Sequence, residues 1–135
     1  MRIIKAKDYA EMSRKAANVI AAQIVAKPNC VLGLATGGTP VGTYKSLIND
    51  WYKVGDLDFS EITTVNLDEY RGLPRTNDQS YWYFMHDNFF DHLVDMKSEN
   101  INILNGMTDD PEGECARYEE KIASYGGIDL FLGGS

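Results

Sequence analysis

The sequence is short of the residues that mark metalloproteins and disulfide-rich secreted proteins. Its 135 residues contain two cysteines, Cys30 and Cys115, and two histidines, His86 and His92. The cysteines have no metal-ligand spacing, and the spacing of the histidines, six residues, does not align them on one helical face, so no metal site is predicted. Two isolated cysteines favour reduced thiols in a cytoplasmic protein, with one disulfide between them as the alternative.

Long apolar runs and positive charge are also scarce. The residues after Met1 lack the apolar core of a signal peptide, and no run is long enough to suggest a transmembrane helix. The net charge is −7, from 13 Lys and Arg against 20 Asp and Glu. We therefore expect no membrane partner and no nucleic-acid partner, although backbone N–H groups can still bind a small anion locally.

The chain does contain an alternation of apolar strand-like segments and helix-like segments. Its length and its 44% hydrophobic content favour a single globular domain over residues 1–135. The alternation predicts an α/β fold, Rossmann-like and doubly wound, with a largely parallel sheet flanked by helices. The expected strands are Arg2–Lys5, Cys30–Ala35, Ile62–Leu67, Ile101–Leu104 and Ile128–Leu132. The expected helices are Asp8–Ala26 with Asp8 as N-cap, Pro40–Asp50, Gln79–Leu93 and Glu112–Tyr125.

The end of the sequence also carries a pattern. A further glycine turn at Gly133–Ser135 follows the last expected strand, at a point where a doubly wound unit continues into a helix. We therefore expect a truncated chain that forms the N-terminal part of a larger domain.

A glycine turn at Thr36–Thr39 is the first candidate binding site. It follows the apolar run that ends at Ala35 and precedes a helix that begins near Pro40. Gly37 and Gly38 let the backbone approach a ligand closely, and the flanking threonines add hydroxyl groups. This arrangement favours an anion such as a phosphate over an ordinary turn. It matches neither the dinucleotide glycine motif nor the P-loop, so no nucleotide cofactor is predicted.

Asp68 and Glu69 form the second candidate site. They follow the expected strand Ile62–Leu67 and should therefore lie at the same edge of the sheet as Thr36–Thr39. A carboxylate there could take a proton from a carbon next to a carbonyl or imine. A loop cap or a solvated charge is an equally good interpretation of either residue.

The expected helix Gln79–Leu93 is rich in aromatic residues. Tyr81, Phe84, Met85 and Phe89 share one face of it, and we predict that this face packs in the core. The histidines of this region are interpreted as surface or structural residues.

Several ordered strings resemble the glucosamine-6-phosphate deaminase (glucosamine/galactosamine-6-phosphate isomerase) family. They cover nearly the whole chain. The two strongest are Leu-Gly-Leu-Ala-Thr-Gly-Gly-Thr-Pro at Leu32–Pro40 and Asn-Leu-Asp-Glu-Tyr-Arg-Gly-Leu-Pro at Asn66–Pro74. The related 6-phosphogluconolactonases share the fold and a Gly-Gly turn, but the second string is typical of the deaminase branch.

The resemblance implies conversion of D-glucosamine 6-phosphate and water to D-fructose 6-phosphate and ammonia, without a metal or organic cofactor. It implies that Thr36, Gly37, Gly38 and Thr39 hold the sugar phosphate. It also implies that Asp68 moves the C2 proton, with Glu69 as a secondary candidate. Because the family includes monomers and hexamers, a homo-oligomer remains open.

The chain departs from the family in its length. Family members continue with a Gly-x-Asp-Gly-His segment whose histidine opens the sugar ring, and this segment is absent here. We therefore expect the 135 residues alone to be inactive. The alternatives are a non-catalytic half-domain that binds phosphosugars, and a sugar-phosphate isomerase or lactonase on the same scaffold.

Overall fold

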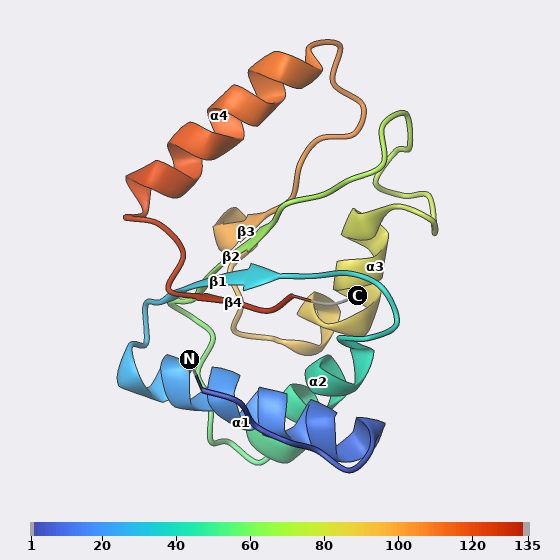
Figure 1. Cartoon of the computed structure of the whole chain (residues 1–135). Helices are drawn as coiled ribbons and strands as arrows, with labels where there is room; N and C mark the ends of the chain where they lie inside the picture. Colours follow the sequence, from blue (N-terminus) through green and yellow to red (C-terminus); the bar gives the residue numbers. More distant parts are fainter. Residues whose placement is uncertain (1, 134–135) are drawn as a thin grey trace.

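The computed structural model describes residues 2–133, which form one parallel sheet with helices on both faces (Figure 1). The sheet has four strands in the order β3-β2-β1-β4, and each neighbouring pair is parallel. In register, Leu32 of β1 lies opposite Thr64 of β2 and Leu130 of β4. The strands are β1 (Val31–Leu34), β2 (Thr63–Asn66), β3 (Ile101–Asn102) and β4 (Leu130–Phe131). The predicted doubly wound α/β class is confirmed.

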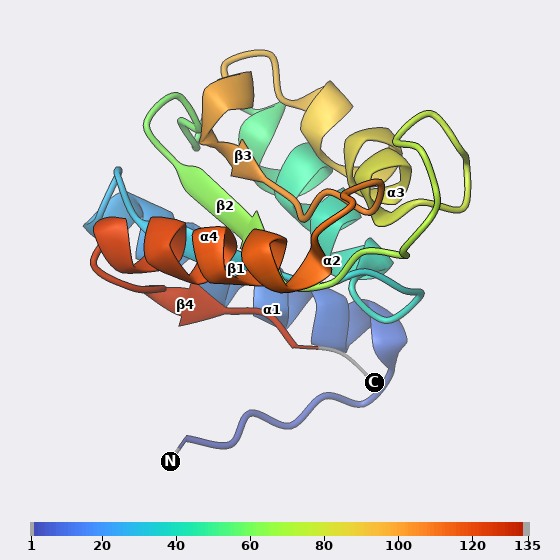
Figure 2. The same ribbon diagram turned by 90° about the horizontal axis from the view of Figure 1, so that it is seen from above.

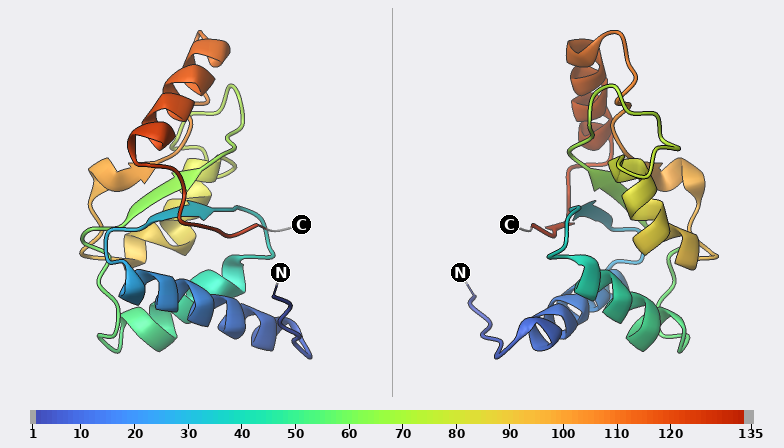
Figure 3. Two further views of the ribbon diagram at one scale, coloured as in Figure 1. Left: turned by 60° about the vertical axis from the view of Figure 1, so that its left-hand side comes forward. Right: turned by 90° about the vertical axis from the view of Figure 1, so that its right-hand side faces the viewer.

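The helices cover the two faces of the sheet unequally. One face carries α1 (Tyr9–Ala26), α2 (Val41–Ser46), the π-helical turn η1 (Leu47–Tyr52) and α3 (Tyr81–Asn88). The other face carries α4 (Pro111–Ser124), which Figure 3 shows apart from the other helices. The short 3₁₀ segments η2 (Phe90–His92) and η3 (Ser98–Asn100) lie in the connection from α3 to β3.

Strand β1 separates two apolar cores, and all its residues are buried. Leu32 and Leu34 face the larger core, where Tyr44 and Phe89 stack with ring centroids 4.9 Å apart. Val31 faces the smaller core under α4. A continuous buried run of this kind is expected for a parallel strand covered on both sides.

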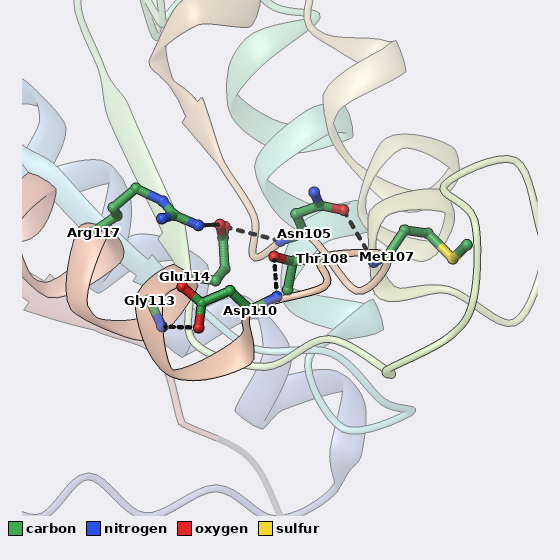
Figure 4. A network of polar contacts seen from close by, with 7 residues as sticks. All are labelled: Asn105, Met107, Thr108, Asp110, Gly113, Glu114 and Arg117. Atoms are coloured by element: carbon green, nitrogen blue, oxygen red, sulfur yellow. Dashed lines mark hydrogen bonds and ion pairs between the residues drawn. The ribbon is translucent and has the colours of Figure 1, made fainter.

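Side-chain caps fix where two of the helices begin. The Asp8 carboxylate accepts the Glu11 N–H at 2.8 Å, which confirms the predicted N-cap of α1. At α4, Asp110 accepts the Gly113 N–H at 3.1 Å, and Pro111 follows it in the first turn (Figure 4). Such caps supply acceptors to N–H groups that have no partner within the helix.

Three of the predicted elements differ from the structure. Arg2–Lys5 is not a strand: it is exposed, lies outside the sheet and runs along the outside of α1 (Figure 2). An isolated extended segment has no neighbour to complete its hydrogen bonds.

The helix expected to reach Leu93 ends at Asn88, because Phe89 adopts φ −139° and ψ −67° as it enters the core. The segment expected as one helix over Pro40–Asp50 changes from α to π geometry at Leu47. The turn predicted at Gly133–Ser135 falls largely outside the described residues.

Candidate functional site

The glycine turn lies at the carboxyl end of β1, as predicted. Gly37 has φ +98°, a left-handed conformation that a glycine adopts without strain. A methyl group added at Gly37 or Gly38 would meet no atom within 4 Å, so the space above the turn is open. Both glycines are exposed, and their backbone is therefore accessible to a ligand.

Two tyrosines from the helices hold this turn in place. The Tyr9 hydroxyl of α1 lies 2.9 Å from the Gly38 carbonyl oxygen and accepts the Gly42 N–H at 2.9 Å. The Tyr44 hydroxyl of α2 donates to the Ala35 carbonyl and accepts the Ala35 N–H at 3.2 Å. Burial raises the pKa of Tyr44, so this hydroxyl stays neutral. The turn is therefore fixed before any ligand binds. No local pattern in the sequence signals the Tyr9 contact, because Tyr9 lies 29 residues before Gly38 in a different helix.

The second loop begins where β2 ends. Asn66 is buried, and its Nδ2 donates to the Leu34 carbonyl at 3.1 Å, which ties the end of β2 to the end of β1. Leu67 and Asp68 then emerge into solvent. Within residues 2–133, no ion pair engages the Asp68 carboxylate.

Glu69, by contrast, is occupied by backbone groups. Its Oε1 accepts the N–H of Tyr70 at 2.9 Å and of Tyr81 at 2.7 Å, and its Oε2 accepts the Trp82 N–H at 3.0 Å. Tyr81 and Trp82 are the first residues of α3. Glu69 thus acts as a helix cap and links the loop after β2 to α3. The geometry favours the capping interpretation of this residue.

A cavity of about 230 Å³ joins the two loops at the carboxyl edge of the sheet. Thr36, which follows β1, and Asp68, which follows β2, both line it. The structure thus brings these two predicted residues together, while Gly37, Gly38 and Thr39 lie outside the lining. Ligands of open parallel sheets bind at this edge.

Tyr81 is a site residue that the sequence analysis missed. It was predicted to pack in the core with Met85 and Phe89, but it is only half-buried and lines the cavity. A hydrogen bond with Tyr70 is the main cause of its raised pKa, partial desolvation adds to it, and its hydroxyl also bonds to Thr36. Tyr81 is the first residue of α3 and directly follows the N-cap Ser80. This position at the end of the helix is the signal in the sequence that distinguishes it from the buried residues of the same face.

Phe131 closes the cavity from β4, and its place depends on Gly33. The two residues pair in register, and a methyl group at Gly33 would lie 2.2 Å from the Phe131 ring. A side chain at position 33 would therefore displace the ring. The ring then forms an apolar wall of the cavity that holds Thr36 and Asp68.

Neither histidine belongs to this site. His86 Nδ1 lies 2.9 Å from the Trp82 carbonyl oxygen, and His92 Nε2 lies 2.9 Å from that of Asp87. Within residues 2–133, no three His, Cys, Asp or Glu side chains are grouped to hold a metal ion. In the same part of the chain, no helix has the length and apolar character that a membrane span requires.

Parallel strands, helices on both faces and a cavity at the carboxyl edge define a doubly wound α/β protein with a candidate small-molecule site at its strand ends. Comparisons with known proteins make this more specific. Residues 5–134 match the family of glucosamine-6-phosphate isomerases and 6-phosphogluconolactonases. The chain belongs to this family.

Individual relatives support the predicted branch of the family. The chain is 54% identical to a glucosamine-6-phosphate deaminase of Lachnoclostridium phytofermentans, over 98% of its own length and 55% of the relative. It is 55% identical to the deaminase of Clostridium acetobutylicum, over 96% of its length and 53% of that relative. The chain thus spans about half the length of the curated relatives it matches.

Solved structures show the same relationship. A monomeric glucosamine-6-phosphate deaminase superposes with a TM-score of 0.93 at 47% identity, covering 98% of this chain and 54% of that one. The 6-phosphogluconolactonase of Thermotoga maritima superposes with a TM-score of 0.73 at 20% identity, covering 93% of this chain and 56% of that one. The second likeness shows the fold alone. The predicted resemblance to the deaminases is confirmed.

Proposed function

We propose that this chain carries the proton-transfer half of a glucosamine-6-phosphate deaminase site. In this proposal the turn Thr36–Thr39 binds the sugar phosphate and Asp68 is the catalytic base. The observation that carries it is that Thr36 and Asp68 line one and the same cavity. The strong similarity to named deaminases supplies the substrate class, an amino-sugar phosphate.

Asp68 is the better base of the two adjacent acids. A base must have an oxygen free to accept a proton from the substrate. Asp68 is exposed at the cavity, whereas each oxygen of Glu69 already accepts a backbone N–H. We therefore assign Glu69 to positioning, since it holds α3 and the cavity residue Tyr81 against the loop.

The chemistry assigned to Asp68 is transfer of one proton from C2 to C1. Its carboxylate takes the proton from C2 of the open-chain sugar, the C2–H electron pair forms the C1–C2 double bond, and the π pair of the C1 carbonyl moves to O1, which takes a proton from solvent, so that an enolamine results. Return of the proton to C1 gives a ketose imine, which water hydrolyses to fructose 6-phosphate and ammonia. By the family resemblance, ring opening belongs to a histidine segment outside these 135 residues.

Deuterium exchange at C2 tests this assignment without requiring the complete reaction. Glucosamine 6-phosphate opens slowly by itself, so in D₂O a functional base replaces the C2 proton, which NMR detects. We expect exchange with this chain, exchange slowed by about 10²–10⁴-fold with Asp68→Asn, and unchanged exchange with Asp56→Asn, which alters an exposed aspartate elsewhere. Exchange at an unchanged rate in Asp68→Asn would overturn the role of Asp68.

Product analysis separates the alternatives. Ammonia release by a polypeptide containing this sequence would support the deaminase. Fructose 6-phosphate without ammonia would indicate an isomerase, and hydrolysis of 6-phosphogluconolactone would indicate a lactonase. Binding of glucosamine 6-phosphate without C2 exchange would identify a phosphosugar-binding half-domain.

The thiols support a cytoplasmic location, which we also propose. Cys30 and Cys115 are both free. Burial, with a smaller contribution from the Asp129 charge, raises the pKa of Cys30 to about 11, so this thiol stays protonated and unreactive. In the cytoplasm, the proposed deamination would serve amino-sugar catabolism. Sedimentation of the protein distinguishes a homo-oligomer from a monomer.

A further inference from the structure

A second cavity lies at the β3 edge of the sheet, away from the site described above. Its volume is about 390 Å³, within the range typical of small-molecule sites. Its lining residues come from the loop before α3 and from α3, η3, β3 and α4. Figure 1 shows α3 and α4 on opposite faces of the sheet. It shares no lining residue with the cavity of Thr36 and Asp68.

The lining of this β3-edge cleft is basic, although the chain carries a net charge of −7. Arg75, Arg117 and Lys121 line it together with one acid, Glu114. Glu114 is engaged: it pairs with Arg117 at 3.1 Å and accepts the Asn105 N–H at 3.2 Å (Figure 4). Within residues 2–133, no ion pair neutralises Arg75 or Lys121. The cleft therefore has an excess of positive charge.

Trp82 fixes one of these cations. Its ring stacks on His86 with centroids 3.7 Å apart, and the Arg75 guanidinium lies 6.0 Å from the ring centroid. A cation over an indole ring is attracted to it. Because these neighbours already engage the ring, charge and not aromatic stacking is the means of recognition that the cleft offers.

The floor of the cleft is rigid and uncharged. The Tyr118 hydroxyl lies 2.6 Å from the carbonyl oxygens of both Asn66 and Asn102 and accepts the Asn66 N–H at 3.1 Å. Desolvation by burial raises the pKa of Tyr118, so the floor offers no competing negative charge. The Ser98 hydroxyl adds a neutral donor at the rim.

We propose that the β3-edge cleft is a second anion site, which binds the phosphate group of a small phosphorylated metabolite between Arg75 and Lys121. Because no ion pair within residues 2–133 compensates these two cations of one lining, a dianion suits them better than a monocarboxylate does. The proposal does not depend on the function assigned to Asp68.

Amide NMR shifts of this chain locate the binding directly. The probes are inorganic phosphate, glucose 6-phosphate and acetate, titrated at constant ionic strength. We expect both phosphates to shift the amides of Ser98, Arg117 and Lys121, and acetate to leave them unchanged. Shifts confined to Thr36–Thr39 would overturn the proposal. Shifts with inorganic phosphate but not with glucose 6-phosphate would overturn the metabolite as the ligand.

Charge variants supply the second test. The double variant Arg75→Gln/Lys121→Gln should raise Kd for glucose 6-phosphate at the cleft at least about tenfold, since it removes both charge-assisted contacts. Lys53→Gln changes an exposed cation outside the cleft and should leave this Kd unchanged. Lys121→Arg, which keeps the charge, should retain binding. Equal Kd values in the double variant and the unchanged chain would overturn the proposal.

Discussion

An aspartate lies at each end of the sheet, and the two have opposite surroundings. At the amino end, Asp129 accepts the Val31 N–H at 2.8 Å and pairs with Lys27 at 2.9 Å. At the carboxyl end, Asp68 is exposed beside a cavity, and no ion pair within residues 2–133 engages it. The same side chain thus ties strands together at one end and is left available for chemistry at the other.

The parallel arrangement explains this division. All four strands begin at one edge and end at the other, so every loop that follows a strand reaches the same edge. The opposite edge presents strand N–H groups, which a carboxylate can satisfy. Polar side chains at the amino edge therefore contribute mainly to stability, and those at the carboxyl edge can contribute to binding.

The largest expected effect is on proton transfer. Asp68→Asn should lower the rate of C2 exchange by about 10²–10⁴-fold, the usual contribution of a positioned base. Its urea midpoint should stay unchanged, because the side chain is exposed. Asp129→Asn should do the reverse, with a lower midpoint and normal exchange. A comparable loss of exchange in both variants would show that the two ends do not divide their tasks in this way.

A substitution between the two ends should weaken the fold strongly. Gly33→Ala places a methyl group 2.2 Å from the Phe131 ring, so the ring must move. We expect a loss of about 1–3 kcal/mol in the free energy of unfolding, typical of overpacking. Gly38→Ala is the matched control, because a methyl group there meets nothing within 4 Å. Equal urea midpoints for the two variants would contradict the close packing of Phe131.

A moderate effect is expected at the carboxyl edge from Tyr81. Tyr81→Phe removes the hydroxyl that bonds to Tyr70 and Thr36 but keeps the ring. We expect weaker binding of glucosamine 6-phosphate by about tenfold, the scale of one or two hydrogen bonds. Tyr83→Phe is the control, since Tyr83 is exposed and lies outside the cavity lining. Isothermal titration calorimetry measures both, and equal affinities would exclude Tyr81 from binding.

The smallest effect is a change in acid stability at the amino edge. The Val31 N–H and then Lys27 hold the pKa of Asp129 below its ordinary value of 3.8. Its stabilising contribution is therefore complete above pH 3.8 and is lost as the pH falls through the folded-state pKa. We expect Asp129→Asn to destabilise the protein above pH 3.8, and the difference from the unchanged chain to shrink as the pH falls below 3.8. Urea melts at pH 7 and pH 3 measure the difference, and a constant difference would contradict this linkage.

The backbone plan could be predicted because it is encoded locally. A continuous apolar run marked β1, the alternation of strand-like and helix-like segments marked β2, and Asp8 marked the start of α1. The meeting of Thr36 and Asp68 followed from strand direction alone, since both loops leave parallel strands. Short-range patterns were thus enough to predict the fold class and the meeting of Thr36 and Asp68 at one edge of the sheet.

The remaining site residues depend on contacts that no local pattern encodes. Tyr9 reaches the glycine turn from 29 residues away, and Phe131 reaches the cavity from the last described strand. Arg2–Lys5 has the composition of a strand but no sheet edge beside it. Tertiary neighbours decide such cases, and they are known only once the chain is folded.

The pairing of β1 with both β2 and β4 also has a consequence for synthesis. β1 can pair with β2 soon after both leave the ribosome, but Val31 and Asp129 are 98 residues apart. At usual translation speeds that separation takes roughly 5–20 s. During this interval the most buried strand of the protein has an open edge, which is the surface most prone to pairing with other chains. The nascent chain is therefore most vulnerable to aggregation before β4 is made, and this is when a chaperone would be most useful to it.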